Sequence, residues 1–481
     1  MGLMTAVASH LLLASVAAPS ECRIPAERAG HTDWFRDAGW GVFVHYLWDC
    51  QVVGERVANT GGPADWDAAI HAFDTERFAD GIARSGAHYC IFTMHQRTRY
   101  LIAPNATFDR LTGYKPGEAC STRDLVEDLY QSLSKRGVKL MLYWTGDGPR
   151  QDDKAAKALG YTPETPVAFV RNWAAVVAEY GERYRDKVLG WWVDGCYAFS
   201  GYNEEKWSIL SAGLRAGNPR RIIAPNNPRM TSSNSSTLND DYTTGEQNSF
   251  GEVPASRWCD GVQWHILSYL GNDWCTPGLR YDAKWLSEYI NRVNRAGGVV
   301  SIDLLLYRDG MVERSHVETL RRMSERLAWI KQRQPVPPGN LASYKQARLL
   351  SLDGTHELGP SGSGTEARTA DFGVDGDPRT AAQAGGEYPW TYEVDLEKVE
   401  PLRRVTIAFA GGTFATEFAV TLSADGKTWR EVGVRRDHDG SAVELTFDPV
   451  EARYVRVQGR KPDGEGQRGG QMAITELGCY R

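Results

Sequence analysis

The sequence predicts an α/β chain of two domains, a (β/α)8-type barrel followed by an antiparallel β-sandwich of the jelly-roll type. Three observations support this prediction. Short apolar runs alternate with longer amphipathic stretches from residue 34 to about residue 333. The proline-rich segment 334–339 (QPVPPG) then ends the pattern, because proline fixes φ and cannot continue a helix. Beyond it, period-two alternation with Asp-Gly turns is typical of antiparallel strands.

The barrel domain is expected over residues 23–334, a proline-rich linker over 335–345 and the sandwich over 346–481. The apolar runs of the first domain lack clean alternation, which suits strands buried on both faces of a parallel sheet. The expected strands are residues 40–45, 88–95, 139–144, 188–194, 221–226, 240–246, 261–266 and 299–305. The expected helices are residues 76–85, 121–136, 166–184, 204–216, 282–296 and 313–331. Eight strands with interleaved helices over roughly 300 residues predict a (β/α)8 barrel.

The N-terminal residues 1–22 have the pattern of a signal peptide. They form a short apolar stretch that ends in small residues near position 17, and the stretch is too short for a transmembrane span. The remaining sequence contains no segment that is apolar enough to cross a membrane. We therefore expect a secreted or periplasmic protein.

Composition limits the range of functions. The net charge of −6 argues against a nucleic-acid partner, which would favour a basic face. The eight cysteines form neither a CxxC pair nor a Cys/His metal spacing. The 16 tryptophans and 21 tyrosines indicate either large cores or aromatic rings that stack on sugars, and composition alone leaves both interpretations open.

The catalytic candidates are side chains at the ends of the expected strands, because functional groups of such barrels gather at the C-terminal face. Polar side chains at the ends of apolar strands are costly unless they line a pocket. They include the carboxylates Asp194 and Glu246, and a carboxylate pair is what glycoside hydrolysis requires. A turn or capping role is the alternative for each. The residues that end the expected strands are His45, His95, Tyr143 with Trp144, Asp194, Asn226, Glu246, Trp264 with His265, and Asp303.

Several segments, in a fixed order, carry a family resemblance. They are residues 34–45 (WFRDAGWGVFVH), 73–95, 189–195 (LGWWVDG), 241–246 (DYTTGE) and 294–310, which begins NRAGGVVSID. Together they resemble the α-L-fucosidase family of retaining glycoside hydrolases. Each segment alone would be a weak signal, whereas the ordered set is specific and covers roughly residues 30 to 335.

The resemblance implies a role for each matching residue. Asp194 would be the nucleophile that forms a covalent glycosyl-enzyme, and Glu246 would be the acid/base. The substrate would be a fucosylated glycan, and catalysis would need no cofactor. The residues expected to bind the sugar are His45, His95, Gln96, Tyr143, Trp144, Trp264, as a ring that stacks on it, and Arg229, as the match to a family arginine near the acid/base.

The sequence also departs from the family pattern. Gln96 stands where the family has a second histidine, and Arg97, Thr98 and Arg99 replace an Asp-Gly-Phe motif. Glutamine can donate and accept hydrogen bonds but cannot become a cation as imidazole can. Two alternatives to an α-L-fucosidase therefore remain open: a related exo-glycosidase that acts on another sugar, and a non-catalytic glycan-binding protein.

The C-terminal region carries a second resemblance. Residues 374–380 (VDGDPRT), 392–396 (YEVDL), 422–429 (LSADGKTW), 452–457 (ARYVRV) and 474–477 (ITEL) resemble the discoidin or coagulation-factor type C fold used as a carbohydrate-binding module. Such modules often hold a structural Ca²⁺. The expected ligands are Asp377, Thr380 and Glu476, which supply the hard oxygens that this ion prefers. The alternative is an Asp-Gly turn with no ion.

Overall fold

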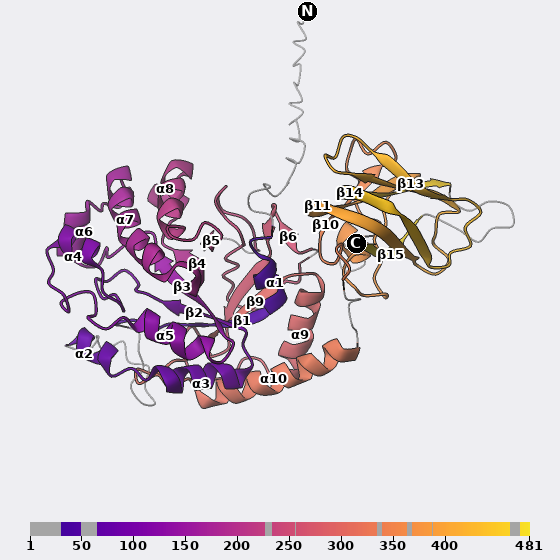
Figure 1. Ribbon diagram of the computed structural model, residues 1–481. Helices are drawn as coiled ribbons and strands as arrows, with labels where there is room; N and C mark the ends of the chain where they lie inside the picture. The colour runs from indigo at the N-terminus through magenta and orange to yellow at the C-terminus, as the bar shows by residue number, and fades with distance from the viewer. Residues whose placement is uncertain are drawn as a thin grey trace, which may run out of the picture.

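The structure is a computed structural model that describes residues 30–49, 65–226, 233–254, 256–333, 339–362, 368–386, 388–461 and 472–481. Figure 1 shows two bodies, an α/β domain that ends with a long helix and a β domain beside it. The expected signal peptide, residues 1–22, and Arg229 lie outside the described residues. Of the helices in the described part of the chain, none combines the length and the apolar character that crossing a membrane requires.

The first domain is built on a curled sheet of seven parallel strands, in the order β5-β4-β3-β2-β1-β9-β8. Their side chains alternate between the two faces, as in any strand. Phe43, Tyr89, Tyr143 and Trp192 fill the inside of the curl, while the opposite face packs against the helices. The strands are β1 (Trp40–Val44), β2 (Tyr89–Thr93), β3 (Lys139–Thr145), β4 (Val188–Asp194), β5 (Ile222–Pro225), β8 (His265–Tyr269) and β9 (Val299–Leu304).

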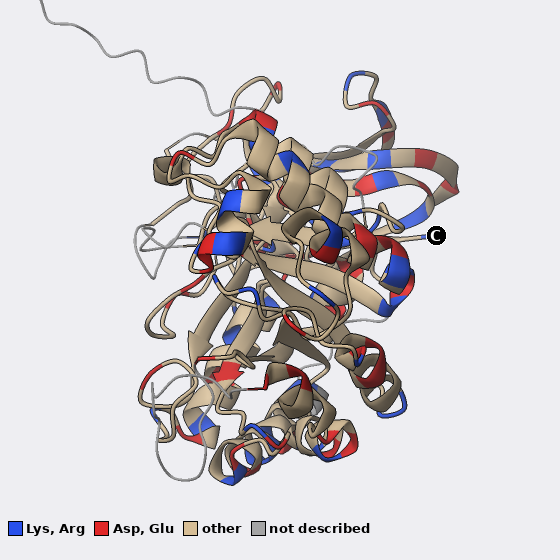
Figure 2. Ribbon diagram, turned by 90° about the vertical axis from the view of Figure 1, so that its left-hand side faces the viewer, with Lys and Arg blue, Asp and Glu red and all other residues tan. Residues whose placement is uncertain are grey.

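All six expected helices are present. They are α3 (Thr75–Ser85), α5 (Leu125–Ser134), α7 (Val167–Tyr184), α8 (Glu204–Leu214), α9 (Ala283–Arg295) and α10 (Arg314–Arg333). Helix α5 starts later than expected because the Asp124 side chain caps it, accepting a hydrogen bond from the Glu127 amide. Four short helices were not expected: α1 (Asp33–Ala38), α2 (Trp66–His71), α4 (Ala106–Thr112) and α6 (Asp153–Leu159). Figure 2 shows charges of both signs concentrated on helices and loops.

Residues 240–247 occupy the eighth position and join the two edges of the sheet. The Asp241 amide donates to the Ile223 carbonyl of β5 at 2.9 Å, and the Leu267 amide of β8 donates to the Gly245 carbonyl at 2.8 Å. The segment pairs with its neighbours only through isolated bridges, so the strand expected at 240–246 closes the barrel without being a regular strand.

The apolar run at 261–266 also differs from expectation. Residues 262 and 263 form β7 (Val262–Gln263), which pairs antiparallel with β6 (Trp258–Cys259) in a hairpin. The parallel strand β8 begins only at His265. Trp264 therefore precedes a barrel strand and does not end one.

The second domain is an antiparallel sheet of six strands, in the order β10-β11-β14-β12-β13 with β15 beside β11. The two longest strands change partners along their length. The first part of β11 pairs with β10, and its last part pairs with β15. The sheet thereby folds over its own core, which includes Trp390 and Tyr392, as in a β-sandwich. The strands are β10 (Gln346–Ser351), β11 (Trp390–Phe409), β12 (Glu417–Ser423), β13 (Arg430–Arg435), β14 (Val443–Lys461) and β15 (Ile474–Tyr480).

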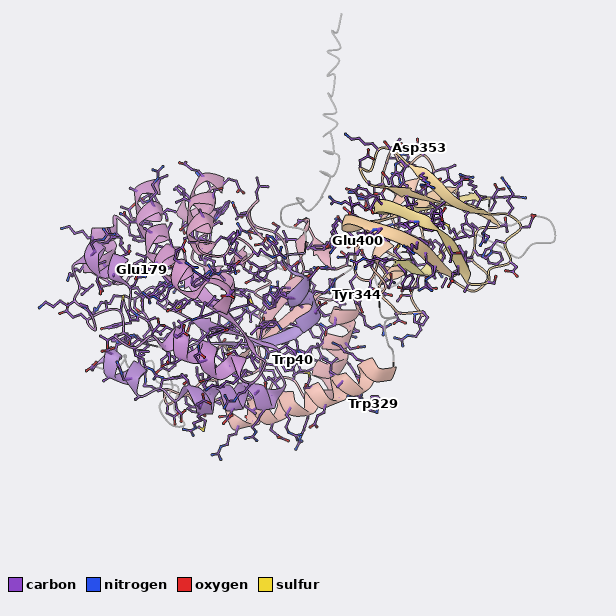
Figure 3. All side chains as sticks on the ribbon, in the orientation of Figure 1. Trp40, Glu179, Trp329, Tyr344, Asp353 and Glu400 are labelled. Atoms are coloured by element: carbon purple, nitrogen blue, oxygen red, sulfur yellow. The ribbon has the colours of Figure 1, made fainter. Side chains whose placement is uncertain are left out.

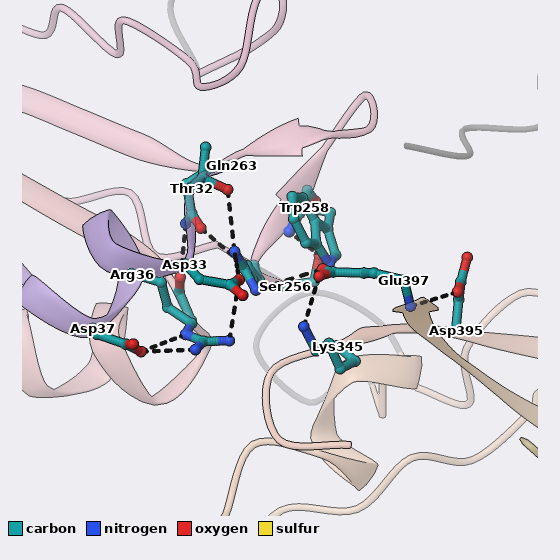
Figure 4. Close-up of polar contacts among 12 residues, drawn as sticks. Thr32, Asp33, Arg36, Asp37, Ser256, Trp258, Gln263, Lys345, Asp395 and Glu397 are labelled. Atoms are coloured by element: carbon teal, nitrogen blue, oxygen red, sulfur yellow. Dashed lines mark hydrogen bonds and ion pairs between the residues drawn. The ribbon is translucent and has the colours of Figure 1, made fainter. Parts of the chain in front are cut away.

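The sandwich contacts the barrel through a buried ionic cluster (Figure 4). Arg257, which is fully buried, donates to Asp33 at 2.8 Å and lies 3.5 Å from Glu397 of the sandwich. Lys345 pairs with the same Glu397 at 2.6 Å. Helix α1 leads into β1 and the β6–β7 hairpin leads into β8, so the contact lies at the N-terminal end of the barrel strands. Tyr344 marks the same boundary in Figure 3.

Candidate active site

Asp194 ends β4 with its side chain directed into the barrel. Trp192 faces the interior and Val193 faces the helices, so the alternation of a strand turns Asp194 inward. Only 8% of the residue is exposed to solvent. A carboxylate at this depth requires hydrogen-bond donors.

Three donors surround the Asp194 carboxylate. The Tyr143 hydroxyl donates to Oδ2 at 2.9 Å, and the Tyr197 hydroxyl donates to Oδ1. The Asn226 amide donates to Oδ1 at 3.3 Å. Gln96 lies behind this set, because its amide donates to the Tyr143 hydroxyl at 2.9 Å. An ionised carboxylate only accepts hydrogen bonds, so this arrangement matches a negatively charged Asp194.

Asn226 also connects Asp194 to Glu246. The same Nδ2 atom donates to Oε2 of Glu246, and the Thr244 hydroxyl donates to the Asn226 Oδ1 at 3.1 Å. The two carboxylates therefore face each other across one amide. Burial, and then the charge of Asp194, raise the pKa of Glu246, while the Asn226 amide opposes the shift. Glu246 thus holds its proton more strongly than an exposed glutamate does.

His45 lies at the end of β1, where Asp303 of β9 fixes its ring. The Nδ1 of His45 and the Oδ1 of Asp303 are 2.8 Å apart, and the Cys275 amide donates to the other oxygen of Asp303 at 2.7 Å. Trp274 packs edge-on against the His45 ring at 6.1 Å. A carboxylate on Nδ1 sets the tautomer, so the Nε2 atom can accept a hydrogen bond from a hydroxyl group.

Asp147, in the loop after β3, is a further carboxylate near Asp194. It lies against Gly195, where an added Cβ would be 2.4 Å from its Oδ1. Burial, opposed by its ion pair with Arg150 and increased by the charge of Asp194, raises the pKa of Asp147 to about 7. The site therefore holds a further carboxyl group, with a raised pKa, that the sequence motifs do not indicate.

The structure does not bring every expected residue to Asp194. His95 is buried behind the sheet, with its ring 4.6 Å from that of Trp144 and 5.2 Å from that of Trp173, and burial lowers its pKa to about 3. Trp144 stacks on Trp173 at 4.5 Å in the same outer core. Trp264 packs in that core too, next to Gly298. Among the residues expected to bind the sugar, His45, Gln96 and Tyr143 lie at the site, and Arg229 lies outside the described residues.

Two residues that contact Asp194 were given no role from the sequence. Tyr197 follows Asp194 by three positions, and a phenol so close to an expected nucleophile is a usable signal. Asn226 directly follows β5 and stood among the residues that end the expected strands, but its bridging role depends on the approach of the 240–247 segment.

The residues expected to bind calcium have other partners in the structure. Asp377 accepts from the guanidinium groups of Arg379 at 2.7 Å and Arg295 of the barrel at 3.1 Å. The Thr380 hydroxyl donates to Asp375, and Glu476 accepts from the Gly376 amide. Within the described ranges, no group of three or more His, Cys, Asp or Glu residues could hold a metal ion. Calcium binding here stays an untested prediction, as does the ion-free turn.

The family comparison agrees with this geometry. The alpha-L-fucosidase family model matches residues 63–333, over half of the chain. The chain belongs to the alpha-L-fucosidase family. An F5/8 type C domain model matches residues 357–477. The protein is therefore a glycoside hydrolase of the fucosidase family with an appended F5/8 type C domain. No curated protein sequence matches the chain.

Solved structures that resemble the chain are distant in sequence. An alpha-L-fucosidase structure from Bacteroides thetaiotaomicron is 14% identical with a TM-score of 0.48, and the match covers 96% of this chain and 98% of that one. A Ruminococcus gnavus GH29 fucosidase in complex with fucose is 14% identical with a TM-score of 0.41, covering 97% and 96%. A chitosan-binding module from a Paenibacillus chitosanase/glucanase is 26% identical with a TM-score of 0.25, covering 30% of this chain and 98% of the module.

Proposed function

We propose that the protein is a retaining exo-glycosidase that hydrolyses terminal α-L-fucosyl residues of glycans by double displacement. The observation that carries this proposal is the single Asn226 amide that donates to both Asp194 and Glu246. Carboxylates within reach of one amide match the ~5 Å separation of retaining enzymes better than the ~6.5–9.5 Å of inverting ones.

The two carboxylates have complementary roles in this mechanism. Asp194, held by donors, attacks the anomeric carbon, and the bond to the leaving oxygen breaks as Glu246 gives that oxygen its proton. Water then attacks the anomeric carbon of the glycosyl-enzyme, Glu246 takes the proton of that water, and the bond to Asp194 breaks. The raised pKa of Glu246 supports the acid role, because a general acid must be protonated before it can act.

Family membership and the polar wall around His45 support the proposed fucosyl specificity. His45, oriented by Asp303, accepts a hydrogen bond from a sugar hydroxyl. Gln96 donates to Tyr143, which in turn donates to Asp194 and so holds the nucleophile in place. The sandwich acts as a carbohydrate-binding module in this proposal, and residues 1–22 direct the protein to the periplasm or outside the cell. Fractionating cells that express the full chain tests the location.

The variant Asp194→Gly tests the proposal on an aryl α-L-fucoside. We expect hydrolysis to fall by at least about 10³-fold, because the nucleophile is lost, and azide to restore part of the activity by attacking the anomeric carbon. NMR of the first-formed sugar should show retention of the anomeric configuration by the wild type. An active Asp194→Gly protein, or an inverted product, would contradict the assignment.

A further inference from the structure

Arg97 is a cation at the wall of the site that the catalytic mechanism does not use. It follows Gln96, whose amide supports Tyr143 beside Asp194. Its own carbonyl accepts from the Gln151 amide at 2.8 Å, which joins the loops after β2 and β3. Its φ of 59° lies in the left-handed region, which is uncommon for residues other than glycine and is often retained at functional sites.

The guanidinium of Arg97 acts on two carboxylates of the site. Its charge opposes part of the rise that burial and Asp194 cause in the pKa of Glu246 and in that of Asp147. The neighbouring arginines have defined partners, because Arg99 pairs with Asp152 at 2.8 Å and Arg150 pairs with Asp147 at 2.7 Å. Among the described residues, the Arg97 guanidinium makes no hydrogen bond or ion pair.

The acid step does not account for this cation. A positive charge near Glu246 favours its ionised form, whereas a general acid must hold its proton. The sugar hydroxyls are neutral and do not require a guanidinium in this position. An anionic group on the substrate does, because it would otherwise approach the carboxylate of Asp194 without a compensating charge.

We propose that Arg97 binds an anionic substituent of the substrate, a sulfate ester or a carboxylate, carried by the sugar at the site or by the unit next to it. This proposal rests on the glycosidase function proposed above. The planar guanidinium of arginine donates two parallel hydrogen bonds to such groups and remains charged at every physiological pH.

Three substrates distinguish a sulfate ester on the sugar at the site from a carboxylate on the unit next to it. They are an aryl α-L-fucoside, the same compound with a sulfate ester on the sugar ring, and a disaccharide of fucose linked to a uronic acid. The wild type should prefer at least one anionic substrate by about 10- to 100-fold in kcat/KM, the range expected for a hydrogen bond to a charged group. The preference should decrease at high salt, because salt screens exposed charges.

The main variant is Arg97→Asn, because asparagine tolerates the left-handed backbone and its effect then reports the lost charge. It should abolish the anionic preference. At a pH low enough for Glu246 to be protonated in both proteins, it should change kcat/KM for the neutral fucoside less than about threefold. Arg97→Lys should retain part of the preference, because lysine keeps the positive charge but lacks the planar guanidinium that donates two parallel hydrogen bonds. Arg99→Asn is the matched control, because its arginine pairs with Asp152, and it should leave the preference intact.

Calorimetry on Asp194→Gly protein, with and without Arg97→Asn, measures binding of the same sugars independently of turnover. Hydrolysis of the neutral fucoside without any anionic preference would refute the role of Arg97 and leave the glycosidase proposal standing. Equal binding of neutral and sulfated fucose to the Asp194→Gly protein would refute it as well. Absence of hydrolysis of all three substrates would instead contradict the glycosidase proposal, while tighter binding of the sulfated sugar would still support Arg97 as an anion site.

Discussion

Asp194 and Glu246 share the Asn226 amide, yet their surroundings differ. Asp194 accepts from two phenols in addition to the amide. Among the described residues, Glu246 accepts a side-chain hydrogen bond from this amide alone, and it faces the charge of Asp194 from a largely buried position. Environments that differ in this way assign one carboxylate to attack and the other to proton transfer.

This difference predicts the pH dependence of the reaction. Because the pKa of Glu246 is raised and its protonated form is the active one, kcat/KM for a fucoside with a poor leaving group should fall only at a pH above the usual range of glutamate. The control is α-L-fucosyl fluoride, whose leaving group needs little protonation, so its alkaline limb should be weaker. An identical limb for both substrates would show that Glu246 is not the acid.

Individual residues were predictable to different degrees. Asp194, Glu246 and His45 stand in motifs at strand ends, and the structure places all three at the site. The orientation of Trp144 could not be predicted, because an apolar run without alternation does not indicate which residues face inward. Tyr143 turns inward, and its neighbour Trp144 must therefore turn outward.

At the scale of elements, the long amphipathic helices and most strands follow from hydrophobic pattern, whereas the closure of the barrel does not. Residues 240–247 carry few apolar side chains and form one backbone hydrogen bond with β5 and two with β8. Such contacts depend on the approach of sheet edges that are distant in sequence. The same tertiary approach places Glu246 next to Asn226.

Gly245 provides a test of this element. Its φ is +59°, and an added Cβ would lie 2.0 Å from the His265 carbonyl oxygen. Gly245→Ala should therefore push the segment away from β8 and displace Glu246, lowering kcat/KM by roughly 100-fold or more, together with the melting temperature. Gly251→Ala is the matched control, since nothing lies within 4 Å of its added Cβ. Wild-type activity in Gly245→Ala would show that this close contact does not position the acid.

At the scale of the whole molecule, the sandwich docks at the N-terminal end of the barrel strands, while Asp194 and His45 lie at their C-terminal ends. The module therefore contacts the barrel at the end opposite the catalytic carboxylates. A sandwich in this position can hold the enzyme on a glycan without blocking the catalytic site.

Glu397 connects the domains, so its removal should lower the stability of the protein and leave its catalytic activity unchanged. Only 4% of its side chain is exposed, and it faces Lys345 and the fully buried Arg257. Glu397→Ala removes the carboxylate that Lys345 pairs with and leaves Asp33 as the carboxylate partner of Arg257, and breaking a buried pair costs about 3–5 kcal/mol. Glu431→Ala breaks an exposed pair with Arg460, which is worth about 0–1 kcal/mol. Urea unfolding should show this difference in the free energy of unfolding, and limited proteolysis should cleave Glu397→Ala faster than the wild type between the domains.

The kcat/KM of Glu397→Ala on a small aryl fucoside should match that of the wild type, because the cluster lies at the other end of the barrel. If kcat/KM fell in parallel with stability, the docking cluster and the catalytic site would have to be coupled through the strands that join them.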